Sequence, residues 1–318
     1  MLLVLLILTL ILIAIWFWLT QPLLATIKPN PVRTVDPARL EAHVRKLSIE
    51  LSPRDVTHIE NLDRAAAYIS SELAQTGASV SEQTYRVEGK TYRNVIGRFG
   101  PDTGERIVVG AHYDAAGSMP AADDNASGVA GLIELGRLLG KQSTAMRVEL
   151  VAFSTEEPPY FRTTGMGSSV HVQSLRKDHA TVRAMLSLEM IGYFSDANGS
   201  QHFPAGFLSA FYPSTGNFIG VVGRVGDGLL VRRVKKAMKS AAPVPVYSIS
   251  APSFVPGIDF SDQLNYWHAG YSAAMITDSA FYRNPNYHGP GDTPEKLDYK
   301  RMAMVVEGVY GAVIDLAR

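Results

Sequence analysis

The chain has 318 residues, of which 46% are hydrophobic and 19% are charged, which is the composition of an ordinary globular protein. Thirty basic residues balance thirty acidic ones, so no net charge favours nucleic acid or an anionic surface as a partner. There are no cysteines, which excludes disulfides, thiolate zinc sites and a cysteine nucleophile. Any transition metal must therefore be held by histidine and carboxylate side chains.

Residues 1–21 are predicted to form a transmembrane anchor. Apart from Thr9 the run is apolar to Leu19, and at ~1.5 Å per residue it is long enough for a hydrocarbon core of ~30 Å. A cleaved signal peptide would carry a basic segment at its start, which is missing, and Trp16 and Trp18 favour an interfacial belt. We therefore expect a single-pass membrane protein. The basic residues that follow the span favour a cytoplasmic domain.

Residues 22–35 are rich in proline and are predicted to be a linker, and residues 36–318 a globular domain. Asp36 followed by Pro37 is typical of a helix start, and a second helix is expected at 59–73. Period-two patterns predict strands at 79–87 and 94–99. Further strands are predicted at 106–114, 147–155, 184–193, 218–223 and 273–278, and helices at 126–139, 167–175, 229–238, 261–269 and 294–316. Apolar strands separated by helices predict one three-layer α/β domain with a mostly parallel, mixed sheet flanked by helices.

Polar side chains stand at the carboxyl ends of these strands, where open α/β sheets bind their ligands. A lone histidine or an acidic pair in such a place is more often a packed or solvated residue. Glu189 is harder to explain in that way, because its neighbours are apolar and a carboxylate so placed needs a cation or strong hydrogen bonds. The residues that gather at this edge are His112, Asp114, Asp124, Glu156, Glu157, Glu189 and His288.

Two histidines with three or four carboxylates and no thiolate favour a divalent metal, zinc foremost. Two ions are accommodated if one carboxylate bridges them and each end adds a histidine and a carboxylate. Paired ions of this kind lie ~3.5–4 Å apart and lower the pKa of a shared water, so that hydroxide is available near neutral pH. A free carboxylate beside them would then carry the proton.

Five motifs in order carry a resemblance to a known family. They are HYD at 112–114, ADDNASG at 122–128, EE at 156–157, LEMIGY at 188–193 and NYHGPGDTPEKLD at 286–298. They resemble the co-catalytic zinc aminopeptidase family, which also contains glutamate carboxypeptidase and glutaminyl cyclase. The resemblance covers the chain from about residue 36 to its end and implies a zinc-exopeptidase-like fold.

The resemblance also implies a role for each residue. Asp124 would bridge two zinc ions and precede a cis peptide bond to Asn125. Glu156 would be the general base that takes a proton from the metal-bridging water, and Asp114 would hydrogen-bond the far nitrogen of His112. One zinc would be completed by Glu157 and His288, and the other by His112 and Glu189.

Three departures from the family pattern are visible. Glutamate stands at 189 where aspartate is common, Gln263 replaces the histidine of a Ser-Asp-His motif, and residues 158–169 differ from the usual glycine-rich continuation. The oxyanion stabiliser is therefore left open, with Tyr266 and Tyr287 as candidates.

The first interpretation is a membrane-anchored zinc exopeptidase, an aminopeptidase that hydrolyses N-terminal peptide bonds of a peptide substrate. Three alternatives stay open. One is carboxypeptidase-type cleavage, in which Arg162 or Arg283 would clamp a substrate carboxylate. The others are glutaminyl cyclisation with a single zinc and a non-catalytic ectodomain. Because such family members are often exported, the resemblance favours a catalytic domain outside the cytoplasm. The preferred residue and the oligomeric state are not predicted.

Overall fold

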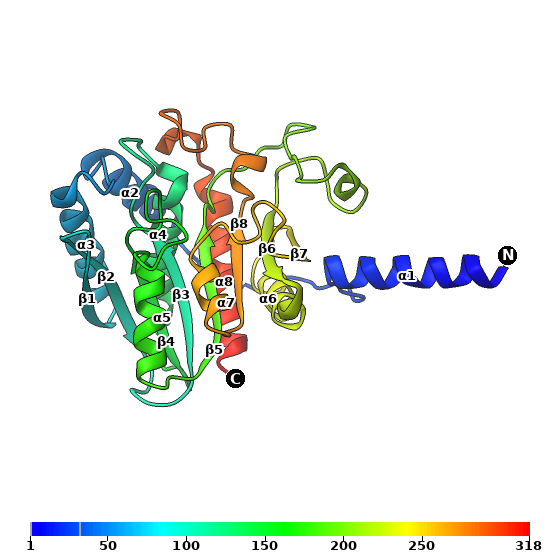
Figure 1. The fold of residues 1–318 in the computed structure, drawn as a ribbon, viewed down its shortest axis with the longest axis horizontal. Coiled ribbons are helices and arrows are strands. Elements are labelled where there is room, and N and C mark those ends of the chain that lie inside the picture. Colours follow the sequence, from blue (N-terminus) through cyan, green and yellow to red (C-terminus); the bar gives the residue numbers. More distant parts are fainter. Residues whose placement is uncertain (1, 32) are drawn as a thin grey trace.

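An eight-stranded β-sheet runs through the protein, with helices on both faces (Figure 1). This computed structural model describes residues 2–31 and 33–318; Met1 of the predicted anchor and Val32 of the predicted linker lie outside the described residues. The strand order is β1-β2-β4-β3-β5-β8-β6-β7. The strands are β1 (Ser79–Val87), β2 (Lys90–Phe99), β3 (Arg106–His112), β4 (Arg147–Phe153), β5 (Val182–Glu189), β6 (Ile219–Arg224), β7 (Val246–Ala251) and β8 (Ala273–Thr277).

The sheet is mixed, as predicted. Strands β4, β3, β5 and β8 are parallel neighbours, whereas β2 pairs antiparallel with both β1 and β4, and β6 pairs antiparallel with β8. Parallel strands bring their carboxyl ends to one edge of a sheet. The last residues of β4, β3, β5 and β8 therefore lie at the same edge of the sheet.

Strand β7 was not predicted from the sequence. It pairs in parallel with β6 at the edge of the sheet, and two of its buried positions are Ser248 and Ser250. Because serines stand on the buried face of β7, its sequence shows no apolar period of two. The strand also follows Pro243 and Pro245, and prolines are typical of a loop. The local pattern therefore carried no signal for this strand.

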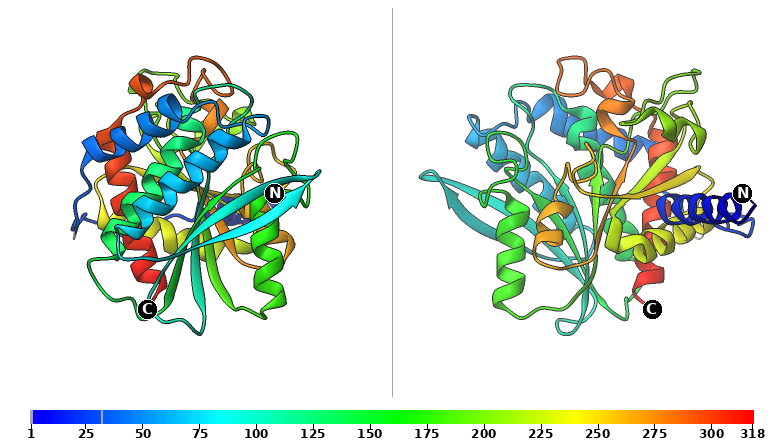
Figure 2. Two further views of the ribbon diagram at one scale, coloured as in Figure 1. Left: turned by 90° about the vertical axis from the view of Figure 1, so that its left-hand side faces the viewer. Right: turned by 45° about the vertical axis from the view of Figure 1, so that its right-hand side comes forward.

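Two layers of helices cover the sheet (Figure 2). One layer shares a core with Ile107 and Val109 of β3, and the other packs with Val108 of the same strand. The first layer consists of α2 (Pro37–Arg45), α3 (Ile59–Ala74), α4 (Gly128–Leu139), α6 (Gly228–Ala241) and α8 (Tyr299–Leu316), and the second of α5 (Gly167–Lys177) and α7 (Gln263–His268). The predicted helix at 294–316 is divided, because Asp298 caps α8 by accepting from the backbone N–H of Arg301, and only a short turn, η6 (Pro294–Lys296), precedes it.

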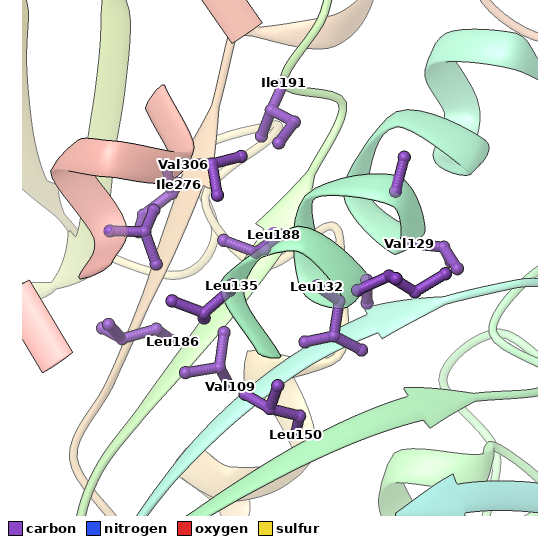
Figure 3. Packing of buried hydrophobic residues seen from close by; sticks show 14 of the residues in the cluster. Val109, Val129, Leu132, Leu135, Leu150, Leu186, Leu188, Ile191, Ile276 and Val306 are labelled. Carbon is purple, nitrogen blue, oxygen red and sulfur yellow. The ribbon is translucent and has the colours of Figure 1, made fainter. Parts of the chain in front are cut away.

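The core between α4 and the sheet is apolar (Figure 3). Leu132 and Leu135 of α4 are fully buried, together with Val109, Leu150 and Leu186 from three adjacent strands. Each such side chain contributes about 1.5–3 kcal/mol when it is removed from water. This packing fixes the strands whose carboxyl ends carry the polar residues.

The predicted transmembrane anchor is wrong: no helix in the described residues is long and apolar enough to cross a membrane. The helix at this end of the chain, α1, runs from Leu2 to Thr20. Its carboxyl end is also attached to the domain. The carbonyl of Thr20 accepts hydrogen bonds from Lys235 Nζ at 2.9 Å and Ser248 Oγ at 2.8 Å. The predicted single-pass membrane localisation is therefore overturned.

The predicted linker contains no regular secondary structure in its described residues, 22–31 and 33–35. Helix α2 then begins at Pro37, and the carboxylate of Asp36 accepts from the backbone N–H of Ala38 at 3.0 Å, as the helix-start pattern predicts.

Candidate metal centre

The seven polar residues that were predicted to gather at one sheet edge do lie there, and the four central strands position most of them. His112 is the last residue of β3 and Glu189 the last of β5, while Glu156 and Glu157 follow β4 by three and four residues. His288 comes from the loop after β8. Asp124 lies in the helical turn η2 (Ala122–Ser127), between β3 and α4. All but His288 are buried.

His112, Asp124 and Glu189 form one cluster. His112 Nε2 lies 3.3 Å from Asp124 Oδ1 and 3.4 Å from Glu189 Oε2. Burial lowers the pKa of His112, but the negative charges of Glu189 and Glu156 outweigh it and raise that pKa well above the ordinary value. A histidine that points its nitrogen at two carboxylates is in position to share one cation with them, since all three offer ligand atoms within 4.8 Å of one another.

Asp124, Glu157 and His288 form a second cluster on the other oxygen of Asp124. His288 Nε2 lies 3.1 Å from Asp124 Oδ2 and 3.2 Å from Glu157 Oε1. Burial and the charge of Asp124 raise the pKa of Glu157 to about 7. Asp124 thus offers one carboxylate oxygen to each cluster, which is the arrangement that a bridging ligand requires.

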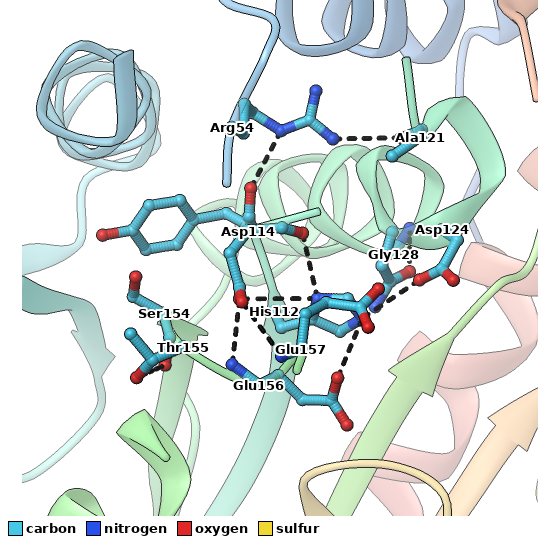
Figure 4. Close-up of polar contacts among 12 residues, drawn as sticks. Arg54, His112, Asp114, Ala121, Asp124, Gly128, Ser154, Thr155, Glu156 and Glu157 are labelled. Atoms are coloured by element: carbon cyan, nitrogen blue, oxygen red, sulfur yellow. Dashed lines mark hydrogen bonds and ion pairs between the residues drawn. The ribbon is translucent and has the colours of Figure 1, made fainter. Parts of the chain in front are cut away.

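Glu156 lies beside the two clusters but is not one of the residues paired with Asp124, which are His112 and His288. Its Oε2 is 3.9 Å from His112 Nε2, and only 5% of the residue is exposed (Figure 4). Burial raises the pKa of Glu156 well above its ordinary value; the charge of His112 opposes the shift, and Glu157 and Glu189 add to it. A buried carboxyl with a raised pKa is suited to take up and return a proton near neutral pH.

Asp114 orients both the histidine and the acidic pair. His112 Nδ1 lies 3.1 Å from the backbone carbonyl of Asp114 and 3.6 Å from its carboxylate, so the carbonyl is the nearer acceptor. The carboxylate accepts from the backbone N–H of Glu156 at 3.1 Å and of Glu157 at 3.0 Å (Figure 4). Asp114 therefore connects the end of β3 to the loop after β4, a contact that the sequence pattern did not predict.

The turn that carries Asp124 is fixed from several sides. The peptide bond from Asp124 to Asn125 is cis, as the family resemblance implies. Asp292 was assigned no role from the sequence, yet its carboxylate accepts from the backbone N–H groups of Asp123 and Asp124, each at 3.0 Å. Asn125 donates to the carbonyl of Leu188 at 2.8 Å and so attaches the turn to β5. The only sequence signal for Asp292 was its place in the motif that contains His288.

Two further residues, Asp123 and Ser261, stabilise the metal centre through hydrogen bonds to the loops and ligands around it. The carboxylate of Asp123 accepts from the backbone N–H of Gly192 at 3.1 Å and from Asn284 at 2.9 Å, so its role is to support the loops. Ser261 Oγ donates to Glu189 Oε2 at 2.6 Å. Because Ser261 precedes α7, this hydrogen bond fixes the longer side chain that replaces the usual aspartate.

The donor set fits divalent zinc. Histidine nitrogens and carboxylate oxygens are ordinary zinc ligands, and each of the two clusters supplies three of them. In the part of the chain that the structure describes, Glu157 Oε1 is buried, and His288 Nε2 lies 3.2 Å from it. Several buried carboxylates at close range repel one another in a low dielectric, and a bound cation would relieve that repulsion.

An apolar pocket opens beside the centre. It has a volume of about 120 Å³ and reaches from Glu189 and Tyr287 toward strand β6 and the edge strand β7. Its lining is mostly aromatic and aliphatic and includes Phe203, Leu208, Tyr212, Phe218, Val222, Tyr247, Ile249, Ile258, Phe260, Met275, Phe281 and Tyr282. The polar residues Gln201, His202, Ser248, Thr277 and Ser279 also line it. For comparison, an apolar cavity of ~150 Å³ holds a benzene-sized group. The pocket is therefore sized for one apolar side chain next to the metal ligands.

Neither of the two candidate arginines offers a free cation in this pocket. Arg283 is 5% exposed; it donates to the carbonyl of Phe218 at 2.8 Å and to Gln201 at 2.9 Å, and stacks on the Phe218 ring at 4.6 Å. Arg162 pairs with Asp259 at 2.6 Å. The Arg283 guanidinium is thus hydrogen-bonded inside the protein through Nε and Nη1, and the Arg162 guanidinium is ion-paired through Nη2.

The two candidate tyrosines differ in position. Tyr266 is fully buried and its hydroxyl lies 2.6 Å from His171 Nδ1, so it is a packed residue. Tyr287 lines the pocket and stacks on the His288 ring at 3.9 Å. Tyr287 is the one that faces the metal centre.

Comparison with known proteins agrees with this geometry. The model of peptidase family M28 matches residues 94–313. The chain is 48% identical over 289 residues, 88% of each chain, to an uncharacterised Escherichia coli protein, YfbL. It is 25% identical over 302 residues to leucine aminopeptidase 1 of Metarhizium robertsii, which covers 89% of this chain and 70% of the fungal protein.

Solved structures share the fold. A zinc aminopeptidase from Bacillus subtilis aligns with a TM-score of 0.70 at 15% identity, over 87% of this chain and 94% of the other. A glutaminyl cyclase from Bacteroides thetaiotaomicron aligns with a TM-score of 0.65 at 18% identity, over 89% and 99%. At these identities the likeness concerns the fold alone.

Proposed function

Since the chain belongs to peptidase family M28 and is a zinc metallopeptidase that acts on peptides, we propose that it is an aminopeptidase with two metal ions. The observation that carries the proposal is the position of Asp124 between two clusters. One of its oxygens faces His112 and the other faces His288. In this proposal His112 and Glu189 complete one zinc site, and Glu157 and His288 complete the other.

When bound, the two ions would activate water and polarise the scissile carbonyl. Side chains of the protein would transfer the proton, position the acidic pair and stabilise the oxyanion. Glu156 would take a proton from the attacking water and return it to the leaving amine, since its buried carboxyl has a raised pKa and reaches the space between the clusters. Asp114 would keep Glu156 and Glu157 in place through their backbone N–H groups. Tyr287 is our candidate for stabilising the developing oxyanion.

We propose further that the substrate begins with a large apolar residue of the size of leucine or phenylalanine. The support comes from the pocket beside Glu189, whose walls are aromatic and aliphatic. Burial of such a side chain contributes about 1.5–3 kcal/mol. A charged first residue would lose its hydration against these mostly apolar walls.

The same pocket argues against carboxypeptidase-type cleavage. That activity needs a cation to bind the substrate carboxylate, but Arg283 is hydrogen-bonded within the wall and Arg162 is paired with Asp259. Glutaminyl cyclisation with a single ion is less well supported, because the chain offers ligands for two ions. His112 lies beside Glu189 in one cluster, and His288 lies beside Glu157 in the other. We also propose that residues 22–35 form a linker and residues 36–318 the catalytic domain.

The proposal is tested by metal content together with a substrate panel. The purified protein, saturated with zinc and desalted, should hold close to two ions per chain by elemental analysis. Aminoacyl amides of Leu, Phe, Ala, Glu and Lys should be hydrolysed with kcat/KM highest for Leu or Phe. A reproducible content of one ion with cyclisation of N-terminal glutamine would favour the cyclase. Hydrolysis confined to carboxyl-terminal residues would refute the aminopeptidase proposal.

A further inference from the structure

Arg54 is a fully buried arginine near the metal centre, and its hydrogen bonds go to backbone carbonyls and not to the proposed metal ligands. It comes from the segment between α2 and α3, and none of its surface is exposed. Its Nε donates to the carbonyl of Tyr113 at 2.8 Å, and Nη2 donates to the carbonyl of Ala121 at 3.0 Å (Figure 4). Nη1 donates to the carbonyls of Leu47 and, at 3.3 Å, Pro120.

These acceptors stand at the two ends of one loop. Tyr113 lies directly between His112 and Asp114, whereas Pro120 and Ala121 directly precede the turn that carries Asp124. One planar guanidinium therefore sets the spacing between the strand that supplies His112 and the turn that supplies Asp124. The backbone adds a further connection, because Ala115 donates its N–H to the carbonyl of Arg54 at 3.0 Å.

The charge of Arg54 is not neutralised by an ion pair. Among the described residues, the hydrogen-bond acceptors of its side chain are all backbone carbonyls. Burial lowers the pKa of Arg54 to about 10, while the nearby charges of Asp114, Asp292 and Asp124 oppose that shift. The guanidinium is thus charged at neutral pH and lies in the electrostatic field of three carboxylates in and around the metal centre.

Stability alone does not account for such a residue. An ion in the interior loses its hydration, and a well-packed apolar side chain of similar volume is often as stable or more so. What an apolar side chain cannot supply is a rigid fork of donors that holds separate carbonyls, together with a permanent positive charge.

We propose that Arg54 is a positioning residue of the metal centre, which fixes the spacing of His112 and Asp124 through the carbonyls at both ends of loop 113–121. This inference rests on the proposed two-metal function. Arg54 acts through backbone groups and through its field on Asp114, Asp124 and Asp292, and it makes no contact with the substrate. Its loss is expected to weaken metal binding first and catalysis as a consequence.

Two variants separate the parts of this role. Arg54→Met keeps the volume and removes both the charge and the donors, whereas Arg54→Lys keeps the charge and loses the planar fork. The control is Arg224→Met. Arg224 also donates to two backbone carbonyls, those of Trp267 at 3.0 Å and Tyr271 at 3.4 Å, and pairs with Asp227 at 2.9 Å. It ends β6, which runs antiparallel to β8, so it lies at the end of the sheet opposite the metal centre.

Zinc affinity is measured by competition with a chromophoric chelator, at a temperature where circular dichroism shows each variant folded. Arg54→Met is expected to bind zinc about 10–100-fold more weakly, as loss of groups that orient metal ligands commonly does. Arg54→Lys should show a smaller loss, and Arg224→Met should match the wild type. With zinc at saturating concentration, KM should change little and kcat should fall in the order of the losses in affinity.

The inference is overturned if folded Arg54→Met binds zinc as tightly as the wild type, or if Arg224→Met loses as much affinity. If Arg54→Met does not fold, Arg54→Lys decides, and wild-type affinity in that variant refutes the role. Wild-type protein that binds no zinc would refute the proposed function instead. Zinc binding that is insensitive to Arg54 refutes only the present inference.

Discussion

Replacement of Asp114 by alanine should lower the stability of the protein even when no metal is bound, because Asp114 holds the loop that carries Glu156 and Glu157. The carboxylate of Asp114 is fully buried and accepts from the backbone N–H groups of Glu156 and Glu157 at 3.1 and 3.0 Å. Asp114→Ala leaves both donors without an acceptor, and each buried orphan costs about 1–3 kcal/mol. The free energy of unfolding should therefore fall by about 2–6 kcal/mol. Asp114→Asn keeps one acceptor oxygen and should cost about half as much.

The assay is thermal unfolding with EDTA, so that metal binding contributes nothing to stability. A loss of this size should lower Tm by about 5–15 °C in a domain of this length. When the measurement is repeated with zinc, the deficit should grow, because a 10–100-fold loss of metal affinity adds about 1.4–2.8 kcal/mol.

Asp196→Ala is the matched control, since it removes a carboxylate whose pairing with Arg301 is exposed to solvent. It should leave the unfolding midpoint unchanged, because exposed ion pairs contribute little. If Asp114→Ala in EDTA unfolds within 2 °C of the wild type, or if the control loses as much, the account of Asp114 as the support of the acidic pair is refuted.

Three further predictions concern the remaining groups. Glu156→Gln should keep its metal content and lose about 10²–10⁴-fold in kcat, and retained turnover would remove Glu156 from the role of general base. His288→Ala should lose metal as well as activity, because a ligand contributes to binding itself, so unchanged metal content would contradict its assignment. Burial, with help from the charges of Arg98 and Arg106, lowers the pKa of His171 from 6.5 to about 3. Between these pH values the unfolded state binds a proton at His171 that the folded state does not, so this residue should lower the free energy of unfolding by about 1.4 kcal/mol for each pH unit of acidification. Urea unfolding should show that this contribution is missing in His171→Asn, and a variant with the same slope as the wild type would contradict the assignment.

Much of the fold followed from local patterns. The hairpin strands β1 and β2, the strand β3 and the helix α3 begin or end close to the predicted residues, because their apolar periods and capping residues are properties of short segments. Strand β7 was missed because two of its buried positions are serines. The start of α8 was placed too early because the capping role of Asp298 depends on where the chain leaves the turn before it.

The membrane prediction failed for a different reason. A hydropathy pattern records composition over a window, and the run from Leu2 to Leu19 is apolar apart from Thr9. It does not record that the helix ends at Thr20 and that Lys235 and Ser248 bind its last carbonyl. The carbonyl at the end of the helix is bound by residues more than 200 positions away in the chain, which a hydropathy window does not cover.

By itself, the sequence determined the class of fold and the kind of chemistry. Alternating apolar strands and helices specified an α/β sheet, and histidines and carboxylates without cysteine specified an oxygen and nitrogen metal site. Only the tertiary structure decided which side chains meet. It brought Asp124 between His112 and His288, placed Asp292 and Arg54 behind that turn, and opened an apolar pocket beside Glu189. The physical reason is that periodicity is local, whereas contacts between distant segments follow from strand order and from the packing that fixes it.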